Sequence, residues 1–157
     1  IVTVTGDGIN TPKNFSVLSG TDMSELVDAA GGLKAKIAKA ISGGPMMGFA
    51  LYDLHVPCIK TSSSFLFLEH DAVSEAQKIQ TACINCGRCV GVCPSHIIPA
   101  RLATLSEHGD MEGFEKLDGM ECCECGCCSY ICPAKRPLTQ SIKSMRKMVM
   151  AERRKKK

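Results

Sequence analysis

Hydrophobic and polar residues follow different patterns in the two halves of the chain. Before residue 75, apolar residues lie in short segments separated by glycine and polar turns, which is typical of strands. After residue 75 they recur at helical spacing. We therefore expect two domains, residues 1–75 and 76–150, followed by a basic tail at residues 151–157.

The first half predicts a small α+β module with one helix laid across a sheet. Strands are expected at residues 1–5, 14–18, 56–60 and 65–68, in a β-β-α-β-β order, and residues 35–41 are weakly strand-like. Thr21 or Asp22 can cap the helix, whose apolar face carries Met23, Leu26, Val27 and Ala30. Residues 43–48, Gly-Gly-Pro-Met-Met-Gly, lack the Lys-Ser/Thr of a phosphate-binding loop, so we interpret them as a structural turn.

The second half predicts three helices. Pro99 suits the first turn of one helix, in which Leu102 and Leu105 share a face, and Gly109 ends it. Asp110 can cap a second helix that carries Met111, Phe114 and Leu117 and stops at Gly119. After Pro137, a third helix brings one apolar stripe together: Leu138, Ile142, Met145 and Val149.

Eight of the eleven cysteines form two runs with the same spacing, Cys-x2-Cys-x2-Cys-x3-Cys-Pro. The first run is Cys83, Cys86, Cys89 and Cys93, and the second is Cys122, Cys125, Cys128 and Cys132. This spacing matches the ligand set of two [4Fe–4S] clusters, in which the fourth cysteine of a run ligates the other cluster. We therefore assign Cys83, Cys86, Cys89 and Cys132 to cluster 1, and Cys122, Cys125, Cys128 and Cys93 to cluster 2.

The spacing has a physical reason. Three cysteines three residues apart let one tight loop reach three corners of a cluster, and Gly87 and Gly126 relax that loop. We expect the fourth cysteine of each run at the start of a helix, with Pro94 or Pro133 stiffening the exit. The thiolates would serve as ligands rather than nucleophiles, and we expect no catalytic residue.

Three other interpretations of the cysteines compete. A structural zinc ion needs only two Cys-x2-Cys pairs and gives no reason for a third and fourth cysteine in both runs. A disulfide framework suits small secreted proteins, but no signal peptide is visible. Redox chemistry of the Cys-x2-Cys type needs one pair rather than two quartets.

Three cysteines lie outside both quartets. Cys58 lies in an apolar stretch and is expected to be a buried structural thiol. Cys123 and Cys127 interleave with the second run and are expected near the cluster, where they could replace a mutated ligand.

Composition limits the other functions. The chain of 157 residues has 45% hydrophobic and 4% aromatic residues and no Trp, which predicts an aliphatic core. A formal net charge of +3 is too small to indicate nucleic acid as a partner. No run reaches the length of a membrane span, so no transmembrane segment is expected. The basic tail is interpreted as a solvated end, with docking to anionic lipid or an acidic partner as the alternative.

The assembled motifs resemble the C subunit of the Rnf electron-transport complex over nearly the whole chain. The resemblance is carried by residues 2–6 (Val-Thr-Val-Thr-Gly), 43–48, 83–94, 124–135 and 137–138. It implies a β-grasp module of the soluble-ligand-binding type followed by an α-helical two-cluster ferredoxin-like domain. Cys58, Cys123 and Cys127 inherit no role from it.

The resemblance also implies a function and a location. The family carries an N-terminal region that binds FMN and NADH, which nothing here matches, so this chain is expected to be a carboxy-terminal portion without NADH oxidation of its own. It would relay electrons between a flavin and another iron–sulfur subunit of a complex that couples NAD and ferredoxin redox chemistry to ion transport. Its place would be peripheral, on the cytoplasmic side of the membrane.

Two further functions stay open. A cobalamin-reductase-like protein of a bacterial microcompartment has a similar architecture, and a zinc-stabilised interaction module belongs to another class. If clusters are bound, an apolar shell is expected from six residues: Ile84, Val90, Val92, Ile97, Ile98 and Ile131.

Overall fold

The computed structural model describes residues 1–34 and 36–156, with only the backbone of Gln77. The chain divides into two compact units, Ile1–Ala72 and Val73–Lys157, which we call the N-terminal and C-terminal units. Each unit has buried clusters of its own.

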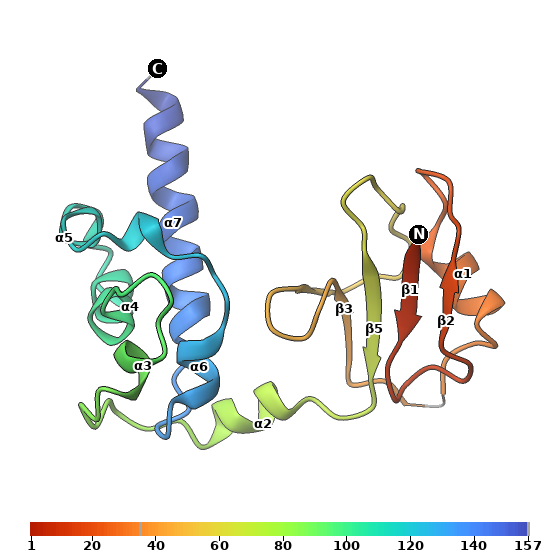
Figure 1. Cartoon of the computed structure of the whole chain (residues 1–157), viewed down its shortest axis with the longest axis horizontal. Coiled ribbons are helices and arrows are strands. Elements are labelled where there is room, and N and C mark those ends of the chain that lie inside the picture. The colour runs from red at the N-terminus through yellow and green to blue at the C-terminus, as the bar shows by residue number, and fades with distance from the viewer. Residues whose placement is uncertain (35, 157) are drawn as a thin grey trace. The chain divides into compact units, whose positions relative to one another are not determined.

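The N-terminal unit is a five-stranded mixed sheet with one helix. Its elements are β1 (Val2–Thr5), β2 (Lys13–Phe15), α1 (Met23–Ala29), β3 (Lys39–Ser42), β4 (Phe49–Leu51) and β5 (Ser64–Leu68). The strands lie in the order β2-β1-β5-β3-β4 (Figure 1). The central pair, β1 and β5, is parallel, and the other neighbours are antiparallel.

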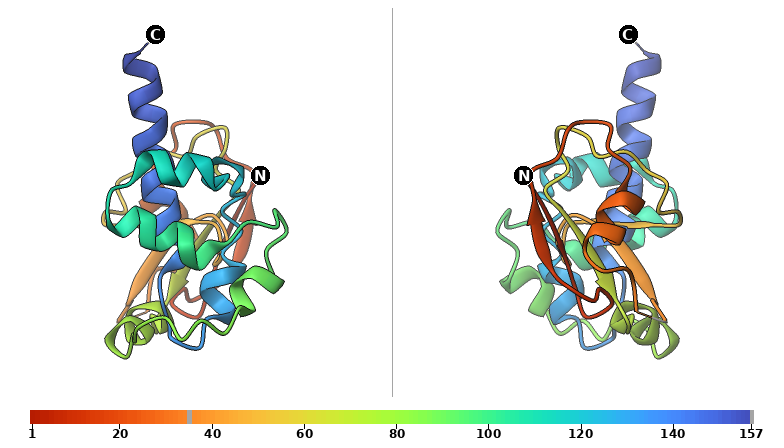
Figure 2. Two further views of the ribbon diagram at one scale, coloured as in Figure 1. Left: turned by 90° about the vertical axis from the view of Figure 1, so that its left-hand side faces the viewer. Right: turned by 90° about the vertical axis from the view of Figure 1, so that its right-hand side faces the viewer.

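Strand alternation and the helix stripe build the core of this unit. Val2 and Val4 of β1 and Phe65 and Phe67 of β5 are buried on one face of the sheet, because successive side chains of a strand point to opposite faces. Helix α1 covers this face (Figure 2) with the predicted stripe, including Met23, and Asp22 is its N-cap. The predicted cap and helix are confirmed.

One strand prediction in this unit is wrong, and one strand was missed. The segment 56–60 is not a strand: its backbone bonds go to the loop before α1, with the Cys58 amide donating to the Thr21 carbonyl at 2.7 Å. Pro57, which has no N–H, forms only an isolated bridge to Asp22. The sequence did not indicate the short strand β4, which lies at the edge of the sheet and pairs with β3 across the predicted turn at 43–48.

Other strand boundaries shift by a few residues. The weak strand predicted at 35–41 is β3, which begins at Lys39; residue 35 lies outside the described residues. The strand predicted at 14–18 is β2, which ends at Phe15.

The C-terminal unit is helical. Its elements are α2 (Ala72–Lys78, which starts on the last residue of the N-terminal unit), α3 (Arg88–Gly91), α4 (Pro99–Glu107), α5 (Met111–Lys116), the 3-10 helix η1 (Gly119–Glu121), α6 (Cys127–Ile131) and α7 (Leu138–Lys155). The three helices that the sequence predicts are α4, α5 and α7, and the short helices were not predicted.

Helices α4, α5 and α7 pack around one apolar cluster. Leu102, Phe114 and Ile142 are fully buried in it, and the predicted stripe of α7 is buried along its length to Val149. Pro99 occupies the first turn of α4, and Asp110 caps α5. The C-terminal part of α7 extends beyond α4 and α5 (Figures 1 and 2). Among the described residues, no helix is both long and apolar enough to span a membrane.

Candidate metal centre

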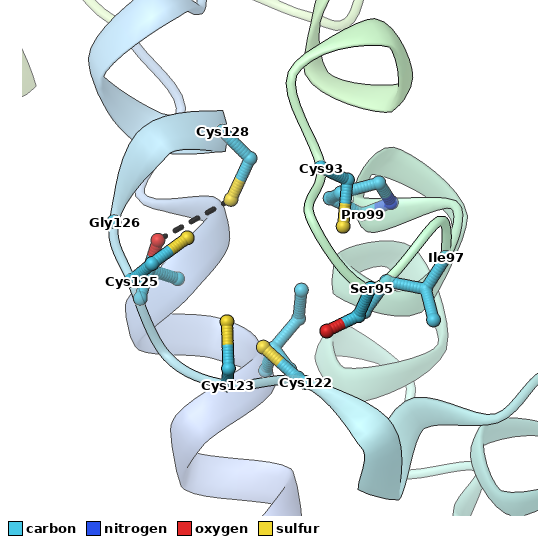
Figure 3. A pocket seen from close by; sticks show the side chains of 11 residues that line it. Cys93, Ser95, Ile97, Pro99, Cys122, Cys123, Cys125, Gly126 and Cys128 are labelled. Carbon is cyan, nitrogen blue, oxygen red and sulfur yellow. Dashed lines mark hydrogen bonds between the residues drawn. The ribbon is translucent and has the colours of Figure 1, made fainter.

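The eight predicted ligands line two cavities in the C-terminal unit. The first cavity is lined by Cys83, Cys86, Cys89 and Cys132, together with apolar residues and Arg136. The second is lined by Cys93, Cys122, Cys125 and Cys128, with Cys123 beside them (Figure 3). Each cavity thus gathers three cysteines of one run and the fourth cysteine of the other run.

The two cavities differ in size. The first has a volume of about 160 Å³. The second holds about 10 Å³, the space of a single water molecule, so its thiols would have to move apart to admit a cluster. Figure 3 shows the sulfur atoms of Cys93, Cys122, Cys123, Cys125 and Cys128 turned toward this space. Within the described part of the chain, no three Cys, His, Asp or Glu side chains are grouped as ligands of a single metal ion.

The backbone repeats with a period of 39 residues around the two cavities. Among the described residues, five non-glycine residues have a positive φ, and four of them form two such pairs: Asn85 with Glu124, and His96 with Lys135. Gly87 and Gly126, at φ +72° and +84°, precede the short helices α3 and α6, and α4 and α7 begin at equivalent residues. Because left-handed backbone is costly for residues with a Cβ, its recurrence indicates that both loops are held in one specific shape.

The fourth cysteines lie at helix ends rather than helix starts. Cys93 comes just after α3, and Cys132 is the C-cap of α6. The expected position at the start of a helix is therefore wrong: each run makes a short helix that contains its third cysteine and ends before its fourth, and the chain then turns before the next helix. This short helix folds the fourth thiol back toward the other run.

The two sites adjoin through a shared apolar wall. Helices α3 and α6 contact each other, and Cys89 and Cys128, from the two linings, are buried in one cluster with Ala103 and Leu138. Buried side chains from both linings therefore belong to one apolar cluster.

Burial affects the protonation of the thiols. Removal from water raises the pKa of Cys122 and of Cys128, so both thiols are held neutral when no metal is near. Binding of a metal would release their protons, since the thiolate is the ligand. The backbone amide of Glu124 already points at the sulfur of Cys122, at 3.4 Å. Three features together fit iron–sulfur clusters: two sets of four thiols, loops with recurring left-handed residues, and a backbone amide directed at a cysteine sulfur.

Several polar residues at the sites were not predicted from the sequence. The hydroxyl of Thr139 lies 3.3 Å from the sulfur of Cys128 and 2.9 Å from the hydroxyl of Ser129. Arg136, which is 8% exposed, lines the first cavity and pairs with Glu107 at 2.5 Å. A position-by-position comparison of the two runs and their flanking residues could have identified Thr139 and Ser129, because the equivalent residues of the first run, Ala100 and Val90, are apolar.

Glu124 anchors the second loop to α7. Its carboxylate accepts from Arg146 and lies 3.3 Å from Lys143. The equivalent residue of the first loop is Asn85, which carries no charge.

The remaining cysteines and the expected apolar shell are placed as follows. Cys58 is buried in the core of the N-terminal unit, as predicted, and burial raises its pKa. Cys123 lines the second cavity, and Cys127 begins α6. Of the six shell residues, Ile97 lines the second cavity, and Ile84, Val90 and Ile98 line the first cavity while remaining exposed to solvent. The other two, Val92 and Ile131, belong to neither lining of the described chain.

Comparison with known protein families agrees with this geometry. Residues 1–50 match the SLBB domain, and residues 82–135 match the 4Fe-4S dicluster domain. The second match contains all eight cysteines of the two runs.

Three relatives are each named as the C subunit of a redox complex. The chain is 41% identical over 156 residues to the C subunit of the Na⁺-translocating ferredoxin:NAD⁺ oxidoreductase complex of Acetobacterium woodii, covering 98% of this chain and 34% of the relative. This chain is homologous to part of that C subunit. Other relatives are the C subunits of the ion-translocating oxidoreductase complexes of Rhodobacter capsulatus, 41% identical over 90% of this chain and 27% of the relative, and of Methanosarcina acetivorans, 34% identical over 97% of this chain and 33% of the relative.

This C-subunit homologue spans about a third of the length of these relatives. The part that it spans holds both domain matches, so the comparison bears on the sheet unit and the cysteine unit described above.

Proposed function

We propose that the C-terminal unit relays electrons through two [4Fe–4S] clusters. Cys83, Cys86, Cys89 and Cys132 would hold cluster 1, and Cys122, Cys125, Cys128 and Cys93 would hold cluster 2. The observation that carries the proposal is the sorting of eight cysteines into two cavities with this membership. The match to the 4Fe-4S dicluster domain supports it independently.

The protein's own contribution is to hold two redox sites close together. Clusters bound there would supply one-electron redox chemistry. The thiolates would fix the positions of the two clusters. The left-handed loop residues hold each set of cysteines in one geometry. The buried side chains of Cys89, Cys128 and Leu138 would keep water out between the two sites.

We infer that the relay belongs to one component of an ion-translocating complex. The name of the Acetobacterium woodii relative supports ferredoxin and NAD⁺ as the redox couples of the complex. Other subunits of the complex would be the partners. The chain would exchange electrons with a flavin and with another iron–sulfur subunit. The chain would lie at the membrane periphery, on the cytoplasmic side, and FMN and NADH would bind elsewhere in the protein.

The N-terminal unit is proposed to be a β-grasp module of the soluble-ligand-binding type. Its central strand β5 lies between two hairpins, β1–β2 and β3–β4, and pairs in parallel with β1; helix α1 covers the sheet. The match of residues 1–50 to the SLBB domain supports this assignment.

The decisive experiment measures metal content. The protein carrying this chain is purified without oxygen, and iron, acid-labile sulfide and zinc are assayed before EPR spectra are recorded after dithionite reduction. We expect about eight irons and eight sulfides from this unit, the content of two [4Fe–4S] clusters. Cys86→Ala should remove iron, whereas Cys58→Ala, in the other unit, should leave the content unchanged.

The alternatives give different results in the same assay. Stoichiometric zinc without sulfide would replace the relay by a zinc-stabilised interaction module. Eight irons in a protein encoded beside microcompartment shell proteins would favour the cobalamin-reductase-like relative.

A further inference from the structure

Thr139 and Ser129 form a chain of hydrogen bonds that ends on a proposed ligand. The backbone amide of Thr139 donates to the Ser129 hydroxyl at 2.8 Å, and that hydroxyl donates to the Thr139 hydroxyl at 2.9 Å. The Thr139 hydroxyl lies 3.3 Å from the sulfur of Cys128 (dashed line at Cys128 in Figure 3).

The direction of the last bond follows from the ligand role of Cys128. A thiolate bound to metal has no proton to donate, so the hydroxyl must be the donor. The oxygen of Thr139 already accepts from Ser129, which leaves its own proton for the sulfur. Because each bond polarises the next, the chain strengthens the donor at its end. Thr139 lies in the first turn of α7, and its neighbour Leu138 is buried, so the hydroxyl is held in place.

At the first site, the residues equivalent to Ser129 and Thr139 cannot form these hydrogen bonds. The residues 39 positions earlier, Val90 and Ala100, line the first cavity beside Cys89, and neither side chain can donate a hydrogen bond. The backbone around both sites is otherwise equivalent. The difference therefore lies in the side chains and applies to one site alone.

We propose that Thr139 is a positioning residue that raises the reduction potential of the site held by Cys122, Cys125, Cys128 and Cys93. If a cluster is bound there, its ligand sulfurs would share the negative charge of the reduced state, and the Thr139 hydroxyl, by donating to one of these sulfurs, would stabilise that charge. Thr139 thereby helps to make the two sites of the relay unequal, and it favours residence of the electron on the second site.

The test measures the midpoint potentials of the two sites in the protein that contains this polypeptide, by EPR-monitored titration with dithionite. Thr139→Val keeps the shape of the side chain and removes the donor. It should lower one of the two potentials and leave the other in place; a tenfold fall in the reduced-to-oxidised ratio at a fixed potential corresponds to about 59 mV for one electron. Thr139→Ser keeps the hydroxyl and should restore the wild-type value.

A second variant introduces the two hydroxyl groups at the equivalent positions of the first site. Val90→Ser combined with Ala100→Thr should raise the potential that Thr139→Val leaves unchanged. Equal shifts of both potentials in Thr139→Val, or none, would overturn the proposal. If that variant does not load iron, the second variant decides: a rise supports the role of the hydroxyl, and an unchanged potential refutes it.

The inference rests on the proposed cluster binding, and the two fail in different ways. Absence of iron and sulfide from the wild-type protein would end the proposed function. Two loaded clusters whose potentials do not respond to these variants would end only the role of Thr139.

Discussion

Single cysteines decide which site each run serves. Cys93 and Cys132 lie in the cavity of the other run's first three cysteines, because a short helix and a turn carry each fourth thiol across. Cys123 lines the second cavity as well and offers a spare thiol there. A ligand substitution at that site must therefore remove the spare thiol too.

Pairs of substitutions test the exchange of fourth cysteines. In a Cys123→Ala background, Cys93→Ala should remove about four of eight irons, one cluster's content. Adding Cys125→Ala should remove little more, because both residues serve one cluster, whereas adding Cys86→Ala should remove most of the remainder. Iron and sulfide analysis measures this. The reverse pattern would mean that each run binds a cluster by itself.

Short helices with defined caps hold the C-terminal unit in shape. Helix α5 has only six residues, so it depends on its cap and on the packing of Phe114. The Asp110 carboxylate accepts from the backbone amide of Gly113 at 2.8 Å. A Cβ on Gly119, in η1, would lie 2.4 Å from the ring of Phe114, so the turn after α5 is also fixed by close contact.

Loss of the α5 cap should destabilise the unit measurably. Asp110→Ala removes the acceptor and should cost about 1 kcal/mol of unfolding free energy. Glu112→Ala, in the first turn of the same helix, removes an exposed carboxylate that pairs with Lys116 and leaves the cap in place, so it should cost less than Asp110→Ala. Denaturant titration of both variants gives the comparison. Equal effects would show that the cap contributes nothing beyond surface charge.

The two units differ in what stabilises them. The N-terminal unit has a continuous core between α1 and the sheet, with close backbone packing where a Cβ on Gly6 would lie 2.0 Å from the Phe67 carbonyl oxygen. The C-terminal unit packs α4, α5 and α7 around one apolar cluster, and it also holds two cysteine-lined cavities. Clusters bound in those cavities would contribute directly to its folding.

Removal of iron should therefore unfold one unit and spare the other. After treatment with oxygen and chelator, hydrogen exchange should accelerate in α3 and α6, whose cysteines lose their metal, while β1 and β5 keep their protection. Gly6→Ala, which forces a Cβ into a left-handed position against β5, should give the opposite pattern. Exchange mass spectrometry resolves the two units. Loss of protection in both units after iron removal would mean that they fold as one.

The sequence by itself determined the features that depend on local spacing. Eight thiols at repeated intervals indicated two clusters, Asp22 and Asp110 indicated helix starts, and the stripe from Leu138 to Val149 indicated α7, because each signal lies within a few turns of chain. Strand β4 was missed because it has only three residues and no buried side chain, and the segment around Pro57 was misassigned because its bridge goes to the distant residue Asp22.

Only the tertiary structure decided what surrounds the thiols. The fourth cysteines were expected at helix starts, yet they follow short helices, because the turn that brings them across is set by contact between α3 and α6. Thr139 lies eleven residues from Cys128 along the chain, and its donor reaches the sulfur only because α7 folds back beside the second loop. Spacing specifies ligands within one loop, whereas the environment of their sulfurs depends on which helices pack against that loop.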